Sequence, residues 1–444
     1  MAIVYKQLHD FVNLLDPDAN TILNMTPEEA EAAVRSGDPE RVRGIEGSFA
    51  IVSKEGAEVT MARSIGRPMR YFMAKQVEGP LLVVAERIDE IHEFLKEKEL
   101  HHQFNPAYTR MVPAHHVVRL QVVGCPDPNP EYTRYLVPER ESLPADLEEI
   151  GRAYVGAMAN ECRKWLAELP EEEPIGVLFS GGIDSGSVFL VLYHAMLDMG
   201  MNPARLKAFT LSVGEGGKDV RQARDFLDTM DLSLFHEVVE ATPEELDYRE
   251  TIEVIEDYKQ RDVEAATATL ALCRLIRARY PEWRYLADGD GGDENLKSYP
   301  IEENPELTIV SVLSNPLLYH EGWGVDRIKH SLTYSGGHSR GSVRTWATAR
   351  RFGFMTFSPY SHPDVIQVSE GIPFIELTDW DHDRLYRLKG EVVRRGVKAI
   401  TGLEMPVNPK RRMQEGTVSE DHFRTVFADD ESVYRQYFQS LYRA

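Results

Sequence analysis

Cysteine is scarce in this sequence, with three among 444 residues, at positions 125, 162 and 273. Three widely spaced thiols form neither a disulfide framework nor a CxxC metal site. Such scarcity is typical of proteins that remain in a reducing compartment. We therefore do not expect a secreted, disulfide-stabilised protein, and the apolar spacing around Cys162 indicates a position in a helix core.

Long apolar runs are also absent. The most apolar stretch, residues 188–196, contains Tyr193 and His194 and is far shorter than the roughly 20 residues that a membrane span requires. The start of the sequence, MAIVYKQLHDF, has no basic segment followed by an apolar one, so it does not predict a secretion signal. We predict a cytoplasmic protein without membrane contacts.

Basic residues are outnumbered by acidic ones, 50 against 72, which gives a formal net charge of −22. A surface this acidic repels phosphate backbones and anionic lipids, so a nucleic-acid partner is not expected. The apolar share of 42% and the charged share of 27% are ordinary for folded proteins and unlike those of disordered chains. At roughly 150 residues per domain, the length predicts two or three domains.

The first part of the sequence has the pattern of a β-rich layer. Residues 44–95 alternate short β-rich runs with turn signals and predict strands near 48–53, 58–62 and 81–85. Prolines then recur at positions 126, 128, 130, 138 and 144, a composition that favours an extended linker. We predict a β-rich domain over 1–123, a linker over 124–146 and a second domain over 147–444.

Helices and strands alternate after the linker. Apolar residues spaced by three and four from Leu147 to Leu166 predict one face of a helix. The segments that follow predict strands at 175–179, 206–213, 234–239 and 283–287, with helices at 186–197, 219–230 and 264–278. This alternation predicts an α/β fold with a doubly wound parallel sheet. The remainder, 304–444, has a mainly helical pattern whose elements periodicity does not order.

The sharpest local signal is FSGGIDS at 179–185, where a buried strand runs into a glycine-rich turn and a helix. Gly181 and Gly182 let backbone N–H groups approach an anion, and the helix adds its positive N-terminal end. Asp184 in the same loop would repel a bare phosphate, so it indicates a bridging cation, best Mg²⁺. The alternative is an ordinary strand-to-helix turn.

A second cluster, DGDGGDE at 288–294, follows the strand predicted at 283–287. The carboxyl ends of parallel strands share one edge of the sheet, so this loop should meet the first one, with four acids lining one site. Packed acids need a cation or a proton to be stable together. The alternative is a solvated acidic loop or an isolated calcium loop, although the spacing is not that of an EF-hand.

Together with AFTLSV at 208–213 and HEVVEATPEEL at 236–246, these two loops resemble the synthetase domain of the asparagine synthetases. GIEGSFAIVS at 44–53, MARSIGRPMRYF at 61–72, LLVVAERIDEI at 81–91 and MVPAHHVVRL at 111–120 look like the family's glutaminase domain. The resemblance implies an Ntn-hydrolase-like N-terminal domain, then an ATP-pyrophosphatase (HUP-like) domain with a helical C-terminal part. The SGGxDS loop is shared by N-type ATP pyrophosphatases, so it specifies ATP cleavage better than it specifies a substrate.

The resemblance also assigns roles to single residues. The positions for ATP and pyrophosphate are Leu178, Ser180, Gly181, Gly182, Asp184, Ser185, Ser212 and Gly289. Asp184 and Asp293 would hold Mg²⁺. Lys389 and the stretch 406–410 look like the family's late basic motif, in which Lys410 would stabilise the adenylate transition state. Asp290 or Glu294 could accept a proton from the attacking amine.

Two departures separate the sequence from the family's pattern. The family's glutaminases use an N-terminal cysteine as nucleophile, whereas this sequence begins Met1-Ala2 and contains no NGE motif, so a degenerate glutaminase domain is expected. The acceptor pocket also differs: Lys297-Ser298-Tyr299 replaces GGY, and residues 256–259 lack the usual DEP. Asp290 replaces the tyrosine of the related β-lactam synthetases, while NPKRRMQEGT at 408–417 resembles their lysine motif, which leaves the branch open.

The leading hypothesis is an AMP-forming amide synthetase that couples a small-molecule carboxylate to ammonia or a substrate amine without using glutamine. Alternatives are β-lactam-type cyclisation and a non-catalytic ATP-binding or scaffold protein. Sulfur transfer or tRNA modification is disfavoured by the charge and by the absence of paired cysteines. The sequence leaves open whether the chain forms a homodimer. The pairs His101-His102 and His115-His116 are not expected to chelate a metal, because neighbours on a strand point to opposite faces.

Overall fold

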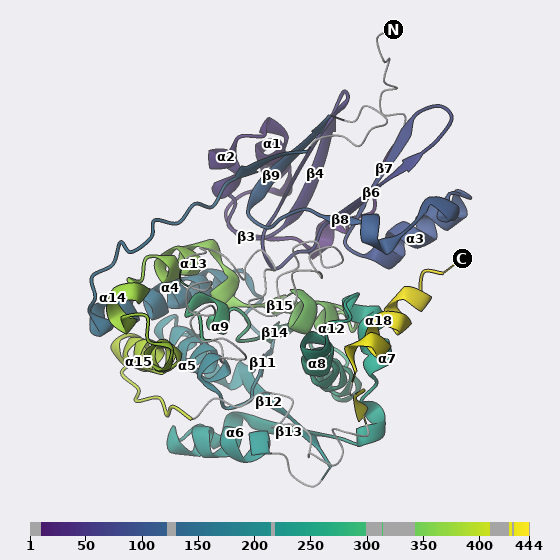
Figure 1. Cartoon of the computed structure of the whole chain (residues 1–444). Helices are drawn as coiled ribbons and strands as arrows, with labels where there is room; N and C mark the ends of the chain where they lie inside the picture. The colour runs from purple at the N-terminus through teal and green to yellow at the C-terminus, as the bar shows by residue number, and fades with distance from the viewer. Residues whose placement is uncertain are drawn as a thin grey trace. The chain divides into compact units, whose positions relative to one another are not determined.

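The structure is a computed structural model of the chain, and it describes residues 10–121, 130–214, 218–298, 313, 342–408, 426–428 and 430–443. The chain divides into two compact units (Figure 1). The first unit consists of Met1–Val137, Tyr319–Ser342 and Gln436–Ala444. The second unit consists of Pro138–Leu318 and Val343–Arg435.

The first unit contains two four-stranded sheets, ordered β1-β7-β6-β8 and β10-β9-β5-β4, and the short pair β2-β3. Neighbouring strands are antiparallel except for β1 and β7. The strands are β1 Asp10–Asn13, β2 Thr21–Ile22, β3 Gly47–Ser48, β4 Ala50–Glu55, β5 Glu58–Arg63, β6 Arg70–Lys75, β7 Pro80–Ala85, β8 Arg110–Met111, β9 His116–Gln121 and β10 Glu131–Arg134. The strands predicted near 48–53, 58–62 and 81–85 are present as β4, β5 and β7.

Alternation along the strands builds the core of this unit between its sheets. Leu82 and Val84 of β7 pack with Val52, Met61 and Val118 of the other sheet. The intervening residues of β7 face the helix α3 (Ile88–Glu97) instead. The helix α1 (Pro27–Ser36) packs on β4, and α2 (Pro39–Arg43) follows it. Because side chains alternate along a strand, each sheet has one face on this core and one face toward a helix.

The predicted strand geometry at the histidine pairs is wrong in detail. His101 and His102 lie in a 3-10 turn, His101–Gln103, and His115 has a left-handed backbone just before β9. The other short turns of the unit are Pro17–Ala19 and Pro106–Tyr108. Within the described residues, no group of three His, Cys, Asp or Glu side chains could hold a metal ion.

The second unit is built on a five-stranded parallel sheet in the order β13-β12-β11-β14-β15. Its strands are β11 Ile175–Leu178, β12 Leu206–Val213, β13 His236–Ala241, β14 Tyr285–Ala287 and β15 Met355–Phe357. The predicted α/β fold with a parallel sheet is therefore confirmed. The edge strand β15 lies in the part of the sequence where periodicity gave no order.

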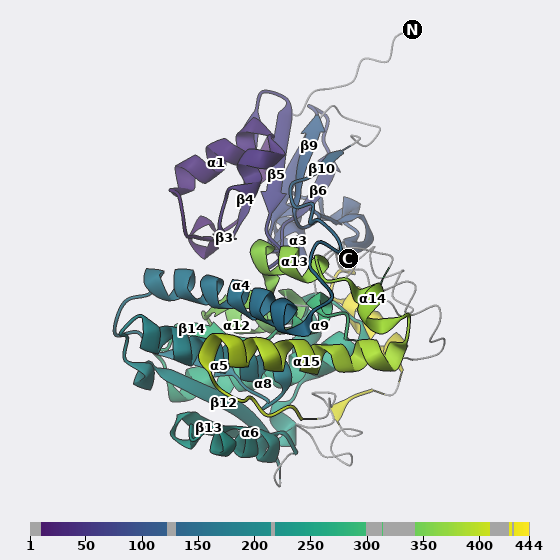
Figure 2. The same cartoon turned by 90° about the vertical axis from the view of Figure 1, so that its left-hand side faces the viewer.

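Helices cover both faces of this sheet. The helices of this unit are α4 Leu147–Glu168, α5 Ile183–Asp198, α6 Lys218–Thr229, α7 Tyr248–Ile255, α8 Gln260–Arg279, α9 Gly292–Asn295, α12 Ala347–Arg350, α13 Pro363–Glu370, α14 Phe374–Thr378 and α15 His382–Thr401. The boundary between the two units falls within α18, Glu431–Ser440. Short 3-10 turns lie at Pro203–Arg205, Ser233–Phe235, Pro243–Glu245 and Pro359–Ser361, and a π-helical turn lies at Ser342–Trp346. In Figure 2, α4, α5 and α15 lie side by side, and contacts join each pair of them.

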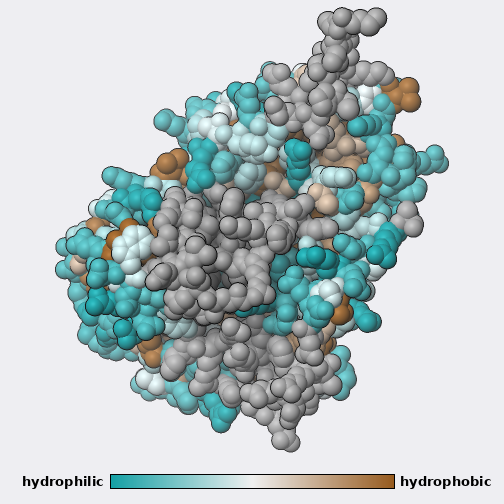
Figure 3. All heavy atoms as spheres, in the orientation of Figure 1, coloured by the Kyte–Doolittle hydropathy of each residue, from teal (hydrophilic) through white to brown (hydrophobic). Residues whose placement is uncertain are grey.

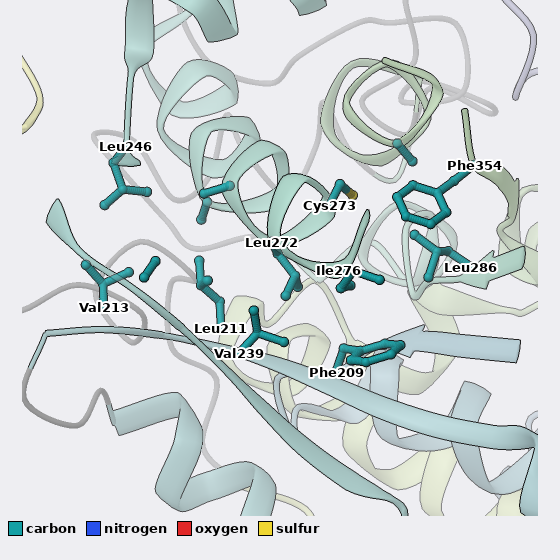
Figure 4. Packing of buried hydrophobic residues seen from close by; sticks show 14 of the residues in the cluster. Phe209, Leu211, Val213, Val239, Leu246, Leu272, Cys273, Ile276, Leu286 and Phe354 are labelled. Carbon is teal, nitrogen blue, oxygen red and sulfur yellow. The ribbon is translucent and has the colours of Figure 1, made fainter. Parts of the chain in front are cut away.

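The main core of the second unit lies between the sheet and α8 (Figure 4). Phe209, Leu211 and Val213 of β12 point toward Leu272 and Ile276 of this helix. On the other face, the Phe226 ring of α6 fills the space beside Gly186, where a Cβ atom would lie 2.6 Å from the ring. Cys162 and Cys273 are fully buried, which confirms the predicted core position of Cys162.

The surface is mainly hydrophilic on the face shown in Figure 3, where hydrophobic residues are scattered among polar ones. Scattered exposed apolar residues are ordinary for a folded protein. Among the helices of the described residues, none has the length and apolar character needed to span a bilayer.

Candidate functional site

The glycine-rich loop connects β11 to α5. Gly181 has a φ of +70°, and a Cβ atom there would lie 2.7 Å from the backbone of Ala223 in α6, so only glycine fits. Gly182 is the N-cap of α5, and the helix begins at Ile183. Asp184 and Ser185 therefore lie in the first turn of the helix, not in the loop as predicted. This places Asp184 where the positive end of the helix stabilises an anion.

Two serine hydroxyls shape the loop. Ser185 Oγ accepts the N–H of Ser180 at 3.2 Å and lies 3.2 Å from Ser180 Oγ. Ser180 Oγ in turn accepts the N–H of Gly182 at 3.3 Å. These bonds hold the loop against the N-terminus of α5, where backbone N–H groups can bind an anion.

The acidic loop leaves the same edge of the sheet. β14 pairs in parallel with β11, with Ala287 opposite Val177, so both loops follow the carboxyl ends of neighbouring strands. A Cβ atom on Gly289 would lie 2.7 Å from Asp184 Cβ, and one on Gly292 would lie 2.2 Å from Asp184 Oδ1. The two loops therefore touch, and the glycines of the acidic loop make that contact possible.

Lys389 of α15 joins the two predicted metal ligands. Its Nζ atom donates to Asp293 Oδ1 at 2.5 Å and also to Asp184 Oδ2. Burial alone would lower the pKa of Lys389, but the adjacent carboxylates of Asp184 and Asp293 outweigh burial and raise that pKa above its usual value. Lys389 is part of the predicted late basic motif, which is the sequence signal that points to it, but the motif predicts no role for this lysine.

The four acids predicted to line one site are divided by the structure. Asp293 meets Asp184, whereas Asp288 Oδ1 accepts the hydroxyl of Ser358 at 2.7 Å and the N–H of Asp290 at 2.9 Å. Burial raises the pKa of Asp288, and burial together with the charge of Asp288 raises the pKa of Asp290. Glu294 is half-buried on α9. Between Asp290 and Asp293 the backbone is left-handed at Gly291, which is the N-cap of α9, so the chain changes course there.

A buried network beneath the site connects the two loops. Tyr360 Oη lies 2.6 Å from Ser187 Oγ of α5, and Asn295 Nδ2 donates to the carbonyl oxygen of Tyr360 at 2.9 Å and to Tyr154 Oη at 3.1 Å. The rings of Tyr154 and Tyr360 stack at 5.7 Å. Because α5 carries Asp184 and α9 carries Asp293, this network fixes the two carboxylates relative to one another. Sequence analysis gave none of these residues a role in the site.

Charged side chains of the segment that replaces the family's DEP form a second network. Lys259 Nζ lies 3.0 Å from Asp257 Oδ2 and 3.2 Å from Asp262 Oδ2. Asp262 also pairs with Arg344 at 3.1 Å. Burial raises the pKa of Asp290, whereas the positive charge of Arg344 and a hydrogen bond with Thr345 act to lower it. This network therefore reaches the acidic loop.

The remaining predicted residues are placed as follows. Leu178 is the last residue of β11, and Ser212 lies on β12 past the point where Phe209 pairs with Leu178. Both positions are at the carboxyl edge of the sheet, next to the glycine-rich loop. Lys410 lies outside the described residues.

The carboxylate pair has the chemistry of a Mg²⁺ site that is completed by a ligand. Asp184 and Asp293 approach closely enough for one ammonium to bond both. Mg²⁺ is commonly held by one or two carboxylates together with phosphate oxygens and water. Because no third acid, histidine or cysteine joins them among the described residues, such an ion would need oxygen ligands from a nucleotide and water.

Comparison with known proteins finds a match to one family over part of the chain. Residues 167–351 match the asparagine synthase family, a range that includes both loops of the site. No curated protein matches the chain. The family uses ATP to form amides, and its members are ligases. This match supports a relationship between residues 167–351 and the asparagine synthetase superfamily.

Proposed function

We propose that the protein is an AMP-forming amide synthetase. In this reaction, a substrate carboxylate attacks the α-phosphate of ATP, pyrophosphate leaves, and the acyl-adenylate then reacts with ammonia or a substrate amine to release AMP. The observation that carries the proposal is the convergence of Asp184 and Asp293 at the N-terminus of α5, beside the glycine-rich loop. That arrangement suits the binding of a departing pyrophosphate.

The glycine-rich loop would bind the pyrophosphate. Its backbone N–H groups and the N-terminal end of α5 offer positive charge, and the hydroxyls of Ser180 and Ser185 are additional donors. Asp184 and Asp293 would hold Mg²⁺, which as a Lewis acid withdraws negative charge from phosphate oxygens. By its resemblance to the family motif, Lys410 would stabilise the charge that develops at the α-phosphate.

The acids of the second pair would receive the proton that the amine loses. When the amine nitrogen forms its bond to the acyl carbon, the C–O bond to AMP breaks and one N–H proton must go to a base. Asp290 or Glu294 would accept it. The raised pKa of Asp290 favours this role, since a carboxylate with a higher pKa holds a proton more strongly once it has accepted one.

We further propose that the first unit is a degenerate glutaminase domain with an Ntn-hydrolase-like fold. Two packed sheets, each with a helix on its outer face, support the fold. The lack of an NGE motif supports the loss of glutamine hydrolysis. The amine would then be ammonia from solution or part of the carboxylate substrate, which keeps β-lactam-type cyclisation as a second candidate because of the motif at 408–417.

The test is the release of pyrophosphate and AMP from Mg-ATP across a panel of small carboxylates, each with and without an amine. Substrate-dependent release of both products supports the synthetase. Release that needs a carboxylate but no added amine favours cyclisation, and nucleotide binding without any release across the panel favours a scaffold. Asp184→Ala should abolish release, whereas Asp198→Ala, the same change at the exposed end of α5, should not.

A further inference from the structure

The ammonium of Lys389 lies between the two carboxylates proposed as metal ligands. It bonds Asp184 and Asp293 together, and 4% of its side chain is exposed, against 24% and 28% for the two aspartates. A cation that belongs to the protein therefore neutralises part of the carboxylate pair from the buried side. The aspartates keep an accessible side from which a ligand can approach.

The helix that carries Lys389 is fixed by a close crossing with α4. A Cβ atom on Gly396 of α15 would lie 2.2 Å from the carbonyl oxygen of Gly151 in α4 and 2.3 Å from Val155 Cγ2. Similarly, a Cβ atom on Gly151 would lie 2.7 Å from Val392 O. Because the two backbones touch, α15 is held in place. The ammonium can leave the carboxylates only if the Lys389 side chain itself moves.

This arrangement opposes the binding of a free divalent ion. An ion bound to both Asp184 and Asp293 would lie close to the Lys389 ammonium, and like charges repel strongly where water is largely excluded. The ammonium would also have to give up two hydrogen bonds to charged groups. Two carboxylates and one ammonium leave a single net negative charge, which is a weak attraction for a free divalent ion.

A bound nucleotide favours binding of the divalent ion, because its phosphates add negative charge and oxygen ligands. We infer that Lys389 is an internal counter-ion that keeps free Mg²⁺ out of the site, so that the metal binds only together with the nucleotide. The inference rests on the proposed function of Asp184 and Asp293 as metal ligands. It assigns Lys389 a positioning role toward the metal.

The experiment measures the binding of Mn²⁺ alone, without nucleotide, by the electron paramagnetic resonance signal of the free ion. Replacing Lys389 by methionine should tighten Mn²⁺ binding by roughly tenfold or more, as expected for coupled sites. The matched control is Lys398→Met on the same helix, where the lysine is exposed and pairs with Glu404. The control should bind Mn²⁺ as weakly as the wild type, and Lys389→Arg, which keeps the charge, should do the same.

Equal Mn²⁺ affinity in the wild type and a folded Lys389→Met variant would overturn the inference. If that variant does not fold, the wild-type protein is measured with and without a non-hydrolysable ATP analogue. Equal Mn²⁺ affinity in the two conditions contradicts the inference. Markedly weaker Mn²⁺ binding without the analogue supports it. The proposed function is tested apart from this by Asp184→Asn and Asp293→Asn. If neither weakens Mn²⁺ binding in the analogue complex, the assignment of the metal ligands fails first.

Discussion

Each unit contains a charged cluster, and the groups that bond the charges differ in kind between the two. In the first unit, the fully buried guanidinium of Arg63 donates to the carbonyl oxygens of Val112 at 2.5 Å, of Ser64 at 3.2 Å and of Arg67 at 3.2 Å. Burial lowers the pKa of Arg63 to about 9. In the second unit, the carboxylates of Asp184 and Asp293 are bridged by the ammonium of Lys389.

The difference separates a structural cluster from the proposed binding site. Backbone carbonyls are part of the fold and cannot be exchanged for a ligand, so Arg63 serves to hold β5 against the segment around Val112. A side-chain ammonium can move away when another cation and an anion arrive together. The acids of the second unit can therefore exchange partners without unfolding, which is what a nucleotide and metal site requires.

The largest expected effect comes from breaking the structural cluster. Arg63→Met removes the donors for several buried carbonyl oxygens and should destabilise the first unit by on the order of 3–5 kcal/mol, the range for losing one partner of a buried charged group. Hydrogen exchange of peptides from β5 and β9 in urea measures it. Arg35→Met, which removes an exposed pair with Glu31, should change stability by less than about 1 kcal/mol. Equal effects of the two changes would contradict a structural role for Arg63.

The second effect is on chemistry and leaves the fold intact. Asp184→Asn removes a proposed metal ligand, and pyrophosphate release should fall by at least about 100-fold, a typical loss for a group that stabilises transition-state charge. The thermal unfolding temperature should stay close to that of the wild type, because 24% of the Asp184 side chain is exposed. Asp198→Asn is the control on the same helix. If activity falls only in proportion to the amount of folded protein, the role of Asp184 is structural.

A smaller effect is expected from the network that holds the two loops together. Tyr360→Phe removes the bond between Tyr360 Oη and Ser187 Oγ, whose length is 2.6 Å. Loss of one buried hydrogen bond costs about 1–3 kcal/mol. Part of this free energy should appear as weaker ATP binding, because the network that fixes Asp184 and Asp293 relative to one another is weakened. The measurement is the KM for ATP and kcat in a double-mutant cycle with Ser187→Ala. Additive losses would show that the two residues act independently.

Sequence reasoning succeeded where a function depends on neighbours in the chain. The strand, glycine-rich loop and helix at 175–198 could be predicted because each glycine and serine acts within a few residues. Lys389 could not be given its role, because it meets Asp184 across 205 positions and Asp293 across 96. The same holds for Tyr360, whose partner Ser187 is 173 positions away. Long-range contacts of this kind follow from packing, and a single sequence does not encode them as a pattern.

The division of the acids was missed for a related reason. Four acids within seven residues predict a single cluster, since the composition carries no sign of where each side chain points. Gly291 has a positive φ, so the backbone changes course between Asp288 and Asp293. Asp288 bonds the hydroxyl of Ser358, which comes from a distant segment, and not the partner of Asp293. This arrangement is compatible with the proposed roles, a metal at one pair and a proton at the other.

The smallest expected effect tests that second pair through pH. Asp290 must be deprotonated to accept a proton from the amine, so the rate of amide formation should rise with pH as the pair loses its proton, above the usual Asp pKa of about 3.9. The hydrogen bond from Ser358 favours the charged form of Asp288 and holds its pKa down. In Ser358→Ala, the pKa of Asp288 should therefore rise, so Asp288 carries less negative charge and raises the pKa of Asp290 less. The acidic limb of the pH–rate profile should then move to lower pH by a fraction of a unit. Ser361→Ala, a nearby serine that bonds only a backbone carbonyl oxygen in the described contacts, is the control and should leave the limb unchanged. An unshifted limb, or one moved to higher pH, in Ser358→Ala would mean that Asp290 does not carry the proton, and Glu294 would become the candidate base.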